Sequence, residues 1–180
     1  MENNFEKMIA EVISLGAFKA NIIEAKDVFL DTSFRDICAT NSCGIYGKCW
    51  MCPPDIGEIH ELMKVIRSYT HALVYQTVSP LEDSFDIEGM QAAKKDFSSI
   101  VQKVKKAFPD KEMLHLGAGG CGVCKVCSKR DDQPCRHPDL AVASLEGYGV
   151  YVSKLAASAG MKYINGQNTV TYFGAVFFRV

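Results

Sequence analysis

Eight cysteines in two groups of four constrain this chain more than any other feature of its sequence. The first group has the spacing Cys-x4-Cys-x5-Cys-x2-Cys and comprises Cys38, Cys43, Cys49 and Cys52. The second group has the spacing Cys-x2-Cys-x2-Cys-x7-Cys and comprises Cys121, Cys124, Cys127 and Cys135. A chain of 180 residues is long enough to bury one hydrophobic core, so it does not need disulfides in order to fold.

The beginning of the chain, its hydropathy and its charge predict a cytoplasmic protein. Its first residues read MENNFEKM, whereas a secretory signal needs a basic stretch followed by an apolar one. No apolar run is long enough to span a bilayer, and a net charge of −1 produces no field that attracts nucleic acid or an anionic membrane. We therefore expect neither partner. In a reducing cytoplasm disulfides are rare, and grouped cysteines are more often metal ligands or redox catalysts.

Hydrophobic periodicity predicts a single α/β domain over residues 1–180, with helices packed on a mixed β-sheet and both cysteine segments in loops that follow strands. A capping box of Asp55 and Glu58 predicts a helix directly after Pro53-Pro54. The last strand is apolar on both faces, and we expect it at the centre of the sheet. Helices are expected over about residues 4–15, 55–69, 87–108 and 145–158, the last capped near Ser144. Strands are expected over about 19–30, 72–78 and 113–116, and two more within 161–180 around the turn Asn165-Gly166.

The second cysteine group carries the more specific signal. Three cysteines at successive two-residue gaps let a tightly coiled loop direct three thiolates at three corners of a cubane, which is the core of the bacterial ferredoxin pattern. Structural zinc more often uses two Cys-x2-Cys pairs separated by a longer loop. This group therefore favours a 4Fe-4S cluster over zinc, with dithiol redox chemistry as a further alternative.

The first group is less specific by itself, because a four-cysteine zinc site could use the same irregular gaps. Because the second group favours iron, we expect the same metal in both groups. Gly44 and Gly47 permit close backbone approach. Trp50 and Met51 can shield the site from water, although core packing explains Trp50 equally well. A helix next to Cys52 would also direct the positive end of its dipole at the site.

The number of ligands limits the function. Two 4Fe-4S clusters need eight thiolates, and the chain has eight cysteines with none spare. Saturated clusters leave no iron open to substrate, which predicts an electron carrier with a redox partner protein rather than an enzyme, and no catalytic residue is assigned. Two alternatives are a structural or interaction module with two zinc ions, and an accessory reductase or activator of a metalloenzyme. The sequence leaves the oligomeric state open.

The assignment of ligands to the two centres also has alternatives. His137 could replace a cysteine, by analogy with Rieske-type sites. Ligands could also cross between the groups, with Cys52 or Cys38 completing the site begun by the second group.

Three weaker patterns have simple explanations. Cys49-x2-Cys52 has the spacing of a thioredoxin-like dithiol but lacks a helix directly after its first cysteine. The glycine-rich stretch 117–122 lacks the Gly-Lys-Ser/Thr of a phosphate loop. The lysines of the helix over 87–108 are interpreted as a solvated helix face; they are Lys94, Lys95, Lys103, Lys105 and Lys106.

Several segments of the chain resemble a known family. The segments are YGKCWMCPP (46–54), GCGVCKVC (120–127) and CRHP (135–138). They resemble the predicted metal-binding proteins called domain of unknown function 2284, found mostly in anaerobic microbes. Residues 144–149 and 168–174 fit as well, so the resemblance covers most of the chain. It implies a metal-binding role, with no reaction or partner attached to it.

Overall fold

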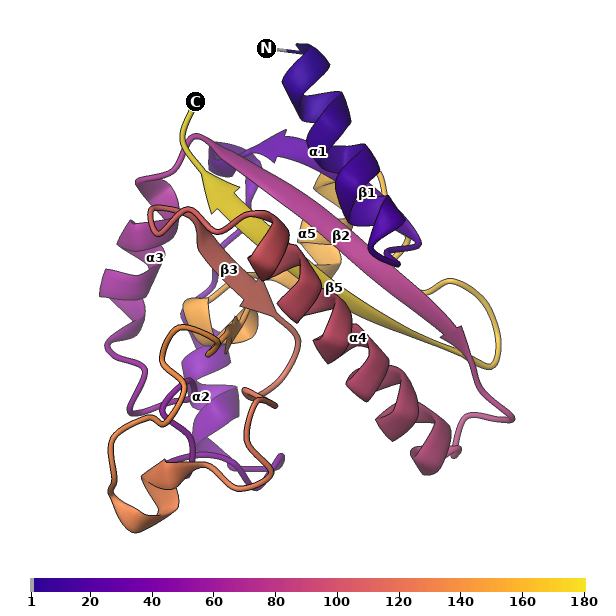
Figure 1. Ribbon diagram of the computed structural model, residues 1–180. Coiled ribbons are helices and arrows are strands. Elements are labelled where there is room, and N and C mark those ends of the chain that lie inside the picture. The colour runs from indigo at the N-terminus through magenta and orange to yellow at the C-terminus, as the bar shows by residue number, and fades with distance from the viewer. Residues whose placement is uncertain (1) are drawn as a thin grey trace.

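Two long antiparallel strands form the spine of the protein in the computed structural model, which describes residues 2–180 (Figure 1). Strand β2 (His71–Pro80) pairs with β5 (Thr169–Phe178) along its whole length. On one side, β1 (Lys19–Glu24) pairs antiparallel with β2; on the other, β3 (Leu114–Gly117) pairs antiparallel with β5. The short β4 (Ala143–Ser144) is parallel to β3. The strand order β1-β2-β5-β3-β4 contains both kinds of pairing, which confirms the predicted mixed sheet.

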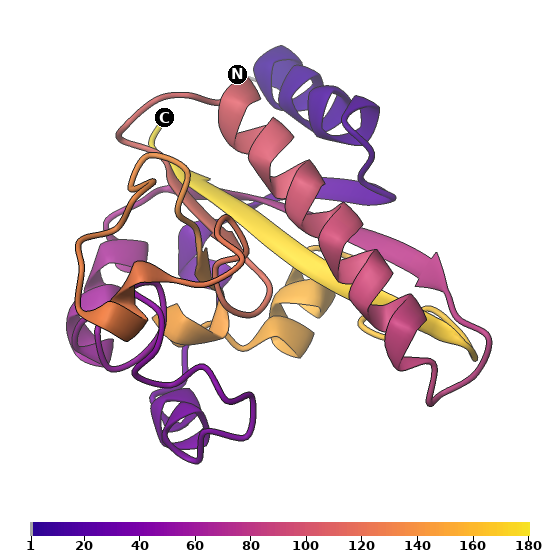
Figure 2. The same cartoon turned by 60° about the horizontal axis from the view of Figure 1, so that its bottom comes forward.

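Helices cover both faces of this sheet (Figure 1, Figure 2). Helices α1 (Glu2–Ser14) and α4 (Ile87–Ala107) pack on one face, and α3 (Ile59–Arg67) and α5 (Val152–Ser158) pack on the other. The remaining helical elements are short: α2 (Ser33–Ala39) and the 3-10 turns η1 (Ala25–Asp27), η2 (Ser128–Asp131) and η3 (Glu146–Tyr148). None of the helices within residues 2–180 combines the length and apolarity needed to cross a membrane.

The side chains of β2 divide the core into two halves. Leu73 and Tyr75 pack with α1 and α4, whereas Ala72 and Val74 pack with α3 and α5, and all four are at most 1% exposed. Successive strand residues point to opposite faces, so a strand covered on both faces must be apolar throughout. The same reasoning applies to β5, whose predicted place at the centre of the sheet is confirmed.

Helix α3 begins later than predicted. The predicted capping box does not form, because the helix starts at Ile59 after an extended Glu58. Asp55 lies instead in a turn, where the Ile56 N–H donates to the Cys52 carbonyl at 3.1 Å. The Asp55 carboxylate forms an ion pair with Lys129 at 2.9 Å. The local pattern predicts that Asp55 caps the helix, but a long-range ion pair with Lys129 holds its carboxylate instead.

The predicted helix over 145–158 is two elements. Gly149 has a φ of +79°, and this left-handed conformation ends η3 at Tyr148. A Cβ on Gly149 would lie 3.2 Å from the Asp31 carbonyl oxygen, so the position needs glycine for its space as well. The chain then forms a bridge between Val150 and Leu30 before α5 begins. Ser144, predicted near the cap of this helix, lies in β4 directly before the N-cap residue Leu145 of η3, and its Oγ accepts from the Gly147 N–H at 2.9 Å.

Three further predictions differ from the structure. The first strand ends at Glu24, because residues 25–27 form η1. The described residues 161–165 form no strand, so the first of the two predicted C-terminal strands is absent; the Asn165 side-chain amide there donates to the Lys162 carbonyl and the Thr171 hydroxyl, both at 3.0 Å. Cys38 lies in α2, so the first cysteine segment follows a helix and not a strand, while the second follows β3 as predicted.

His115 of β3 is buried in its neutral form. The residue is 8% exposed, and its Nε2–H donates to the Phe108 carbonyl oxygen at 3.0 Å. Its Nδ1 has no hydrogen-bond partner within residues 2–180. Burial, partly offset by that hydrogen bond, lowers the pKa of His115 from 6.5 to about 4. The stability that neutral His115 contributes is therefore complete above pH 6.5 and is lost as the pH falls toward the folded-state pKa, because the unfolded chain binds the proton first.

We expect this group to reduce the free energy of unfolding by about 2 kcal/mol between pH 7 and pH 5. His115→Gln should lack that contribution, so its stability should depend less steeply on pH. Urea denaturation of both proteins at the two pH values measures the difference. Equal pH dependence in the two proteins would contradict the assignment.

Candidate metal centre

The first cysteine loop, residues 38–58, is folded by short turns. Gly44 and Gly47 have φ values of +72° and +67°, which reverse the chain direction. The Gly47 N–H donates to the Pro53 carbonyl at 2.9 Å and closes the segment between them. Inside it the Cys52 N–H donates to the Cys49 carbonyl at 3.0 Å. Cys49 is thereby held at 3% exposure, and it is the one buried cysteine of the eight.

The second cysteine loop, residues 118–142, folds back on itself after Cys127. The Ser128 hydroxyl donates to the Pro134 carbonyl at 2.8 Å, and the Gln133 N–H donates to the Ser128 carbonyl at 3.0 Å. These bonds return the chain so that Cys135 reaches the same cavity as Cys127. The predicted loop character of this segment is confirmed, apart from the single turn of η2.

The two loops lie side by side at one end of the sheet and are joined by an interloop clamp of Trp50, Asp55, Lys129 and Gln133 (Figure 1, Figure 2). The Trp50 indole Nε1–H donates to the Gln133 carbonyl at 2.9 Å. The Lys129 ammonium pairs with Asp55 at 2.9 Å and lies 4.5 Å from the centre of the Trp50 ring. Sequence reasoning missed Asp55 and Lys129 as partners, because nothing local to either residue indicates the pairing.

The clamp brings cysteines from both groups around one cavity, here called the cysteine cavity, of about 100 Å³. Apolar side chains of Ile45, Trp50 and Met51 contribute to its wall, which fits the predicted shielding role of the last two. Its five cysteines are Cys49 from the first group and Cys121, Cys124, Cys127 and Cys135 from the second. The first group is therefore divided, since Cys49 lies among the second group.

The other three cysteines do not line this cavity, and the charges of Cys38 and Cys43 act on Cys52. Cys52 contacts Cys49, and its Sγ is 3.3 Å from the position that a Cβ on Gly120 would occupy. A hydrogen bond to Cys49 is the largest cause of a raised pKa of the Cys52 thiol. Burial and the negative charges of Cys49, Cys43 and Cys38 raise it further. All eight cysteines are free thiols within one region of the molecule.

Cys49 forms hydrogen bonds with residues of both cysteine loops. A hydrogen bond from the Cys52 thiol is the largest of the effects that lower the pKa of Cys49 to about 6, against the opposing effect of burial. The backbone N–H of Cys121 and the Cys127 thiol lower this pKa as well. Deprotonated sulfur is the form that binds metal, so the surroundings of Cys49 suit a ligand.

Positive side chains surround the cysteine cavity. Lys48, Lys125 and Arg130 line it and are exposed, and none of its lining residues, all of which lie in the described part of the chain, is an aspartate or glutamate. Such charges offset the negative charge of several thiolates. The predicted helix dipole does not contribute next to Cys52, because α3 begins only at Ile59.

Of three further histidines, one lies at the cysteine cavity. His137 lines the cysteine cavity, while His60 lies on the exposed side of α3 and His71 stacks against Phe178. Within residues 2–180, no three His, Cys, Asp or Glu side chains converge on the position of a single metal ion.

Trp50→Phe removes the hydrogen bond to Gln133 and weakens the attraction to Lys129 while keeping an aromatic ring. We expect it to reduce the free energy of unfolding by about 1 kcal/mol, because the Gln133 carbonyl loses its donor. Metal should also pass faster to a chelator, since the two loops separate more readily. Chelator competition followed by absorbance measures this, with Trp50→Tyr as a second aromatic variant. A release rate equal to that of the wild type would show that the clamp does not hold the loops together.

The model of a family described as predicted metal-binding protein, domain of unknown function 2284, matches residues 21–178. No curated protein matches the chain. The solved structure of selenomethionine-labelled epoxyqueuosine reductase is similar, with 11% identity and a TM-score of 0.40, over 97% of this chain and 46% of that chain. The chain thus spans less than half of that reductase, and a likeness of this degree supports no argument about function. Because the family model covers both cysteine loops and most of the sheet, the protein belongs to the predicted metal-binding family, domain of unknown function 2284.

Proposed function

We propose that this protein binds two 4Fe-4S clusters through its eight cysteines and carries electrons. The observation that carries the proposal is the arrangement of thiols, in which Cys49 of the first group and all four cysteines of the second group line one cavity at one end of the sheet. Thiolates are the ligands that iron–sulfur clusters use. The Cys-x2-Cys-x2-Cys segment lies on this cavity in full.

The surroundings of the cavity suit a cluster. The donors that face it are sulfur with one histidine, and no carboxylate lines it, so hard oxygen-loving cations are disfavoured. Ile45, Trp50 and Met51 limit the access of water, and Lys48, Lys125 and Arg130 favour added negative charge. A bound 4Fe-4S cluster gains and loses single electrons. This chain would hold it through thiolates and adjust its potential through these neighbours.

Saturation of the ligands separates electron transfer from catalysis at the metal. Eight cysteines are the number that two cubanes require, which leaves neither an open iron nor a spare thiol. A redox partner protein is therefore part of the proposal. The competing proposal is a zinc-binding structural or interaction module, which the same thiols could form.

We expect protein purified without oxygen to contain about eight iron and eight sulfide ions per chain. It should be brown, and its visible absorption should bleach on reduction. Cys124→Ser and Cys43→Ser should each lose about half of the iron, because each removes a ligand of a different cluster. Iron, sulfide and zinc quantification on the same samples measures this. A colourless protein with stoichiometric zinc and no sulfide would exclude the iron–sulfur proposal.

The contacts of Cys49 with Cys127 and with the Cys121 N–H support a role for Cys49 in the cluster of the second loop. By ligand number, Cys135 would then complete the cluster of the first loop, as the fourth cysteine does in two-cluster ferredoxins.

The spectra of single-cluster variants test this assignment. Cys124→Ser should retain the signal of the first-loop cluster alone, and Cys43→Ser the signal of the second-loop cluster alone. We expect the electron paramagnetic resonance spectrum of reduced Cys49→Ser to match that of Cys124→Ser. A match to Cys43→Ser would mean that Cys49 serves its own sequence group.

A further inference from the structure

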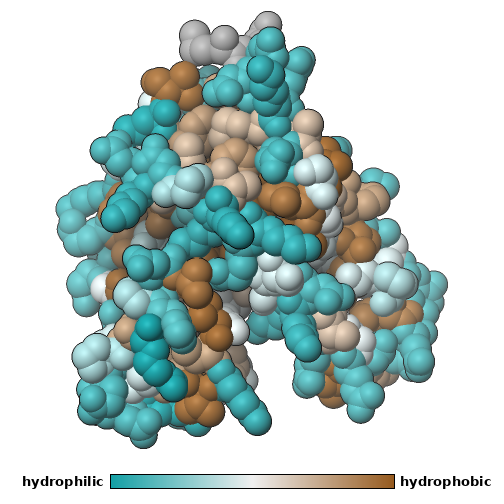
Figure 3. All heavy atoms as spheres, in the orientation of Figure 1, coloured by the Kyte–Doolittle hydropathy of each residue, from teal (hydrophilic) through white to brown (hydrophobic). Residues whose placement is uncertain are grey.

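Two patterns that the sequence left without a role, the lysines of α4 and the glycine-rich stretch 117–122, meet around a second cavity. This α4 cavity has a volume of about 320 Å³, which is within the range of small-molecule sites. One wall is the α4 segment from Lys95 to Gln102, and the other is the stretch from Gly117 to Val123. In the space-filling view, the surface is hollowed between the lobe that carries the cysteine loops and the N-terminal half of α4 (Figure 3).

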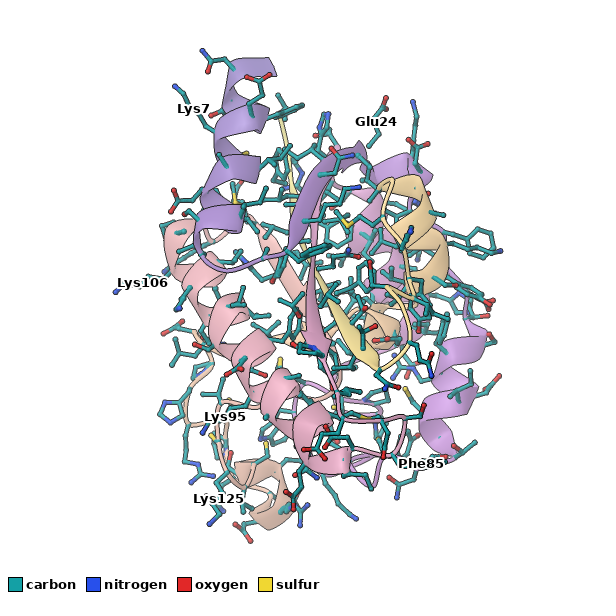
Figure 4. The ribbon with its side chains drawn as sticks, turned by 90° about the vertical axis from the view of Figure 1, so that its right-hand side faces the viewer. Lys7, Glu24, Phe85, Lys95, Lys106 and Lys125 are labelled. Carbon is teal, nitrogen blue, oxygen red and sulfur yellow. The ribbon has the colours of Figure 1, made fainter. Side chains whose placement is uncertain are left out.

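The mouth of the α4 cavity is positively charged. Lys95 lines it, and the Lys94 ammonium lies 2.9 Å from the position that a Cβ on Gly119 would occupy. None of the residues that line this cavity is an aspartate or glutamate. Lys95 lies at the same end of the molecule as Lys125 of the second cysteine loop (Figure 4). A negatively charged group would therefore be attracted to this mouth.

The glycine wall offers backbone donors. No backbone carbonyl within the described residues accepts a hydrogen bond from the N–H groups of Gly119, Gly120 and Gly122. Gly119 has a φ of +66°, and without a side chain its backbone can be approached closely. Successive free N–H groups in such a turn form a concave site for anions.

The floor of the α4 cavity is apolar. Phe97, Val101 and Val142 contribute to it and are 1%, 5% and 8% exposed. Leu140 also lines the cavity and is 48% exposed, so a ligand with an apolar body attached to its anionic group would cover this side chain from water. An inorganic anion would leave it uncovered.

We propose that the α4 cavity binds a small organic anion, in which a phosphate or carboxylate group is attached to an apolar body. The anionic group meets Lys94, Lys95 and the glycine N–H groups, and the apolar body lies against Phe97, Val101 and Val142. Cys121 and Val123 line both this cavity and the cysteine cavity, so the ligand would lie beside the metal centre. The binding itself does not depend on which metal the cysteines hold.

Isothermal titration calorimetry of the metal-loaded protein tests the proposal with four probes. We expect saturable one-to-one binding of phenyl phosphate, or of benzoate if the natural ligand is a carboxylate. Inorganic phosphate should bind about tenfold more weakly, since it buries no apolar surface. Neutral benzyl alcohol should give no measurable heat of binding.

Lys94→Met/Lys95→Met should weaken the binding of the better aromatic anion by about tenfold or more, because two ammonium partners are lost. Lys103→Met/Lys106→Met removes the same charge from the same helix and should bind as the wild type does. Equal affinities of the two double variants, or no saturable binding of either aromatic anion to the wild type, would overturn the proposal. Iron and sulfide are counted on the same samples. Protein purified without oxygen that holds stoichiometric zinc and no sulfide, and still binds the anion, would exclude the iron–sulfur proposal and leave this one intact.

Discussion

The ion pair between Asp55 and Lys129, covered by the Trp50 ring, is the contact on which the site depends. It joins two segments that α3, β2, α4 and β3 separate in the sequence, and apart from Cys38 in α2 these segments have only short turns. Together with the hydrogen bond from Trp50 to Gln133, it holds the loops so that Cys49 lies among the cysteines of the second loop. The sheet makes this contact possible because it places the C-terminal end of β3 and the start of α3 at the same end of the molecule.

Those parts of the fold that depend on hydrophobic periodicity could be predicted from the sequence. The stripe from Ile87 to Phe108 is α4, and the apolar run after His71 is β2, because burial on a fixed face is encoded within each segment itself. The errors have long-range causes. Asp55 has a good local capping pattern, but Lys129 competes for it. Gly149 must bend the chain because Asp31, Ile59 and Met63 crowd it, and no neighbouring residue in the sequence reveals that.

The same distinction applies to the candidate site. The ligand type and the loop character of the cysteine segments follow from composition and spacing, which are local properties. The division of the first group around Cys49 could not be predicted, since spacing gives no distance between two loops. The lysines of α4 were interpreted as a solvated face because helical periodicity places them opposite the core. That interpretation omits the stretch 117–122, which only the tertiary structure places beside Lys94 and Lys95.

The pairing of β3 with β4 holds the two ends of the second cysteine loop together. Leu116 lies opposite Ala143 and Gly117 opposite Ser144, so residues 118–142 leave the sheet and return to it at the same place. Residues 118–142 form no part of the sheet, and its longest ladder, β2 with β5, does not include the β3–β4 pair that closes the loop. To open, this loop has to break the interloop clamp and the hydrogen bonds from Gln102 and Lys105 to the Leu140 and Ala141 carbonyls, but none of the β2–β5 ladder. The contacts that a cofactor has to displace on entry are therefore separate from those that hold the sheet together.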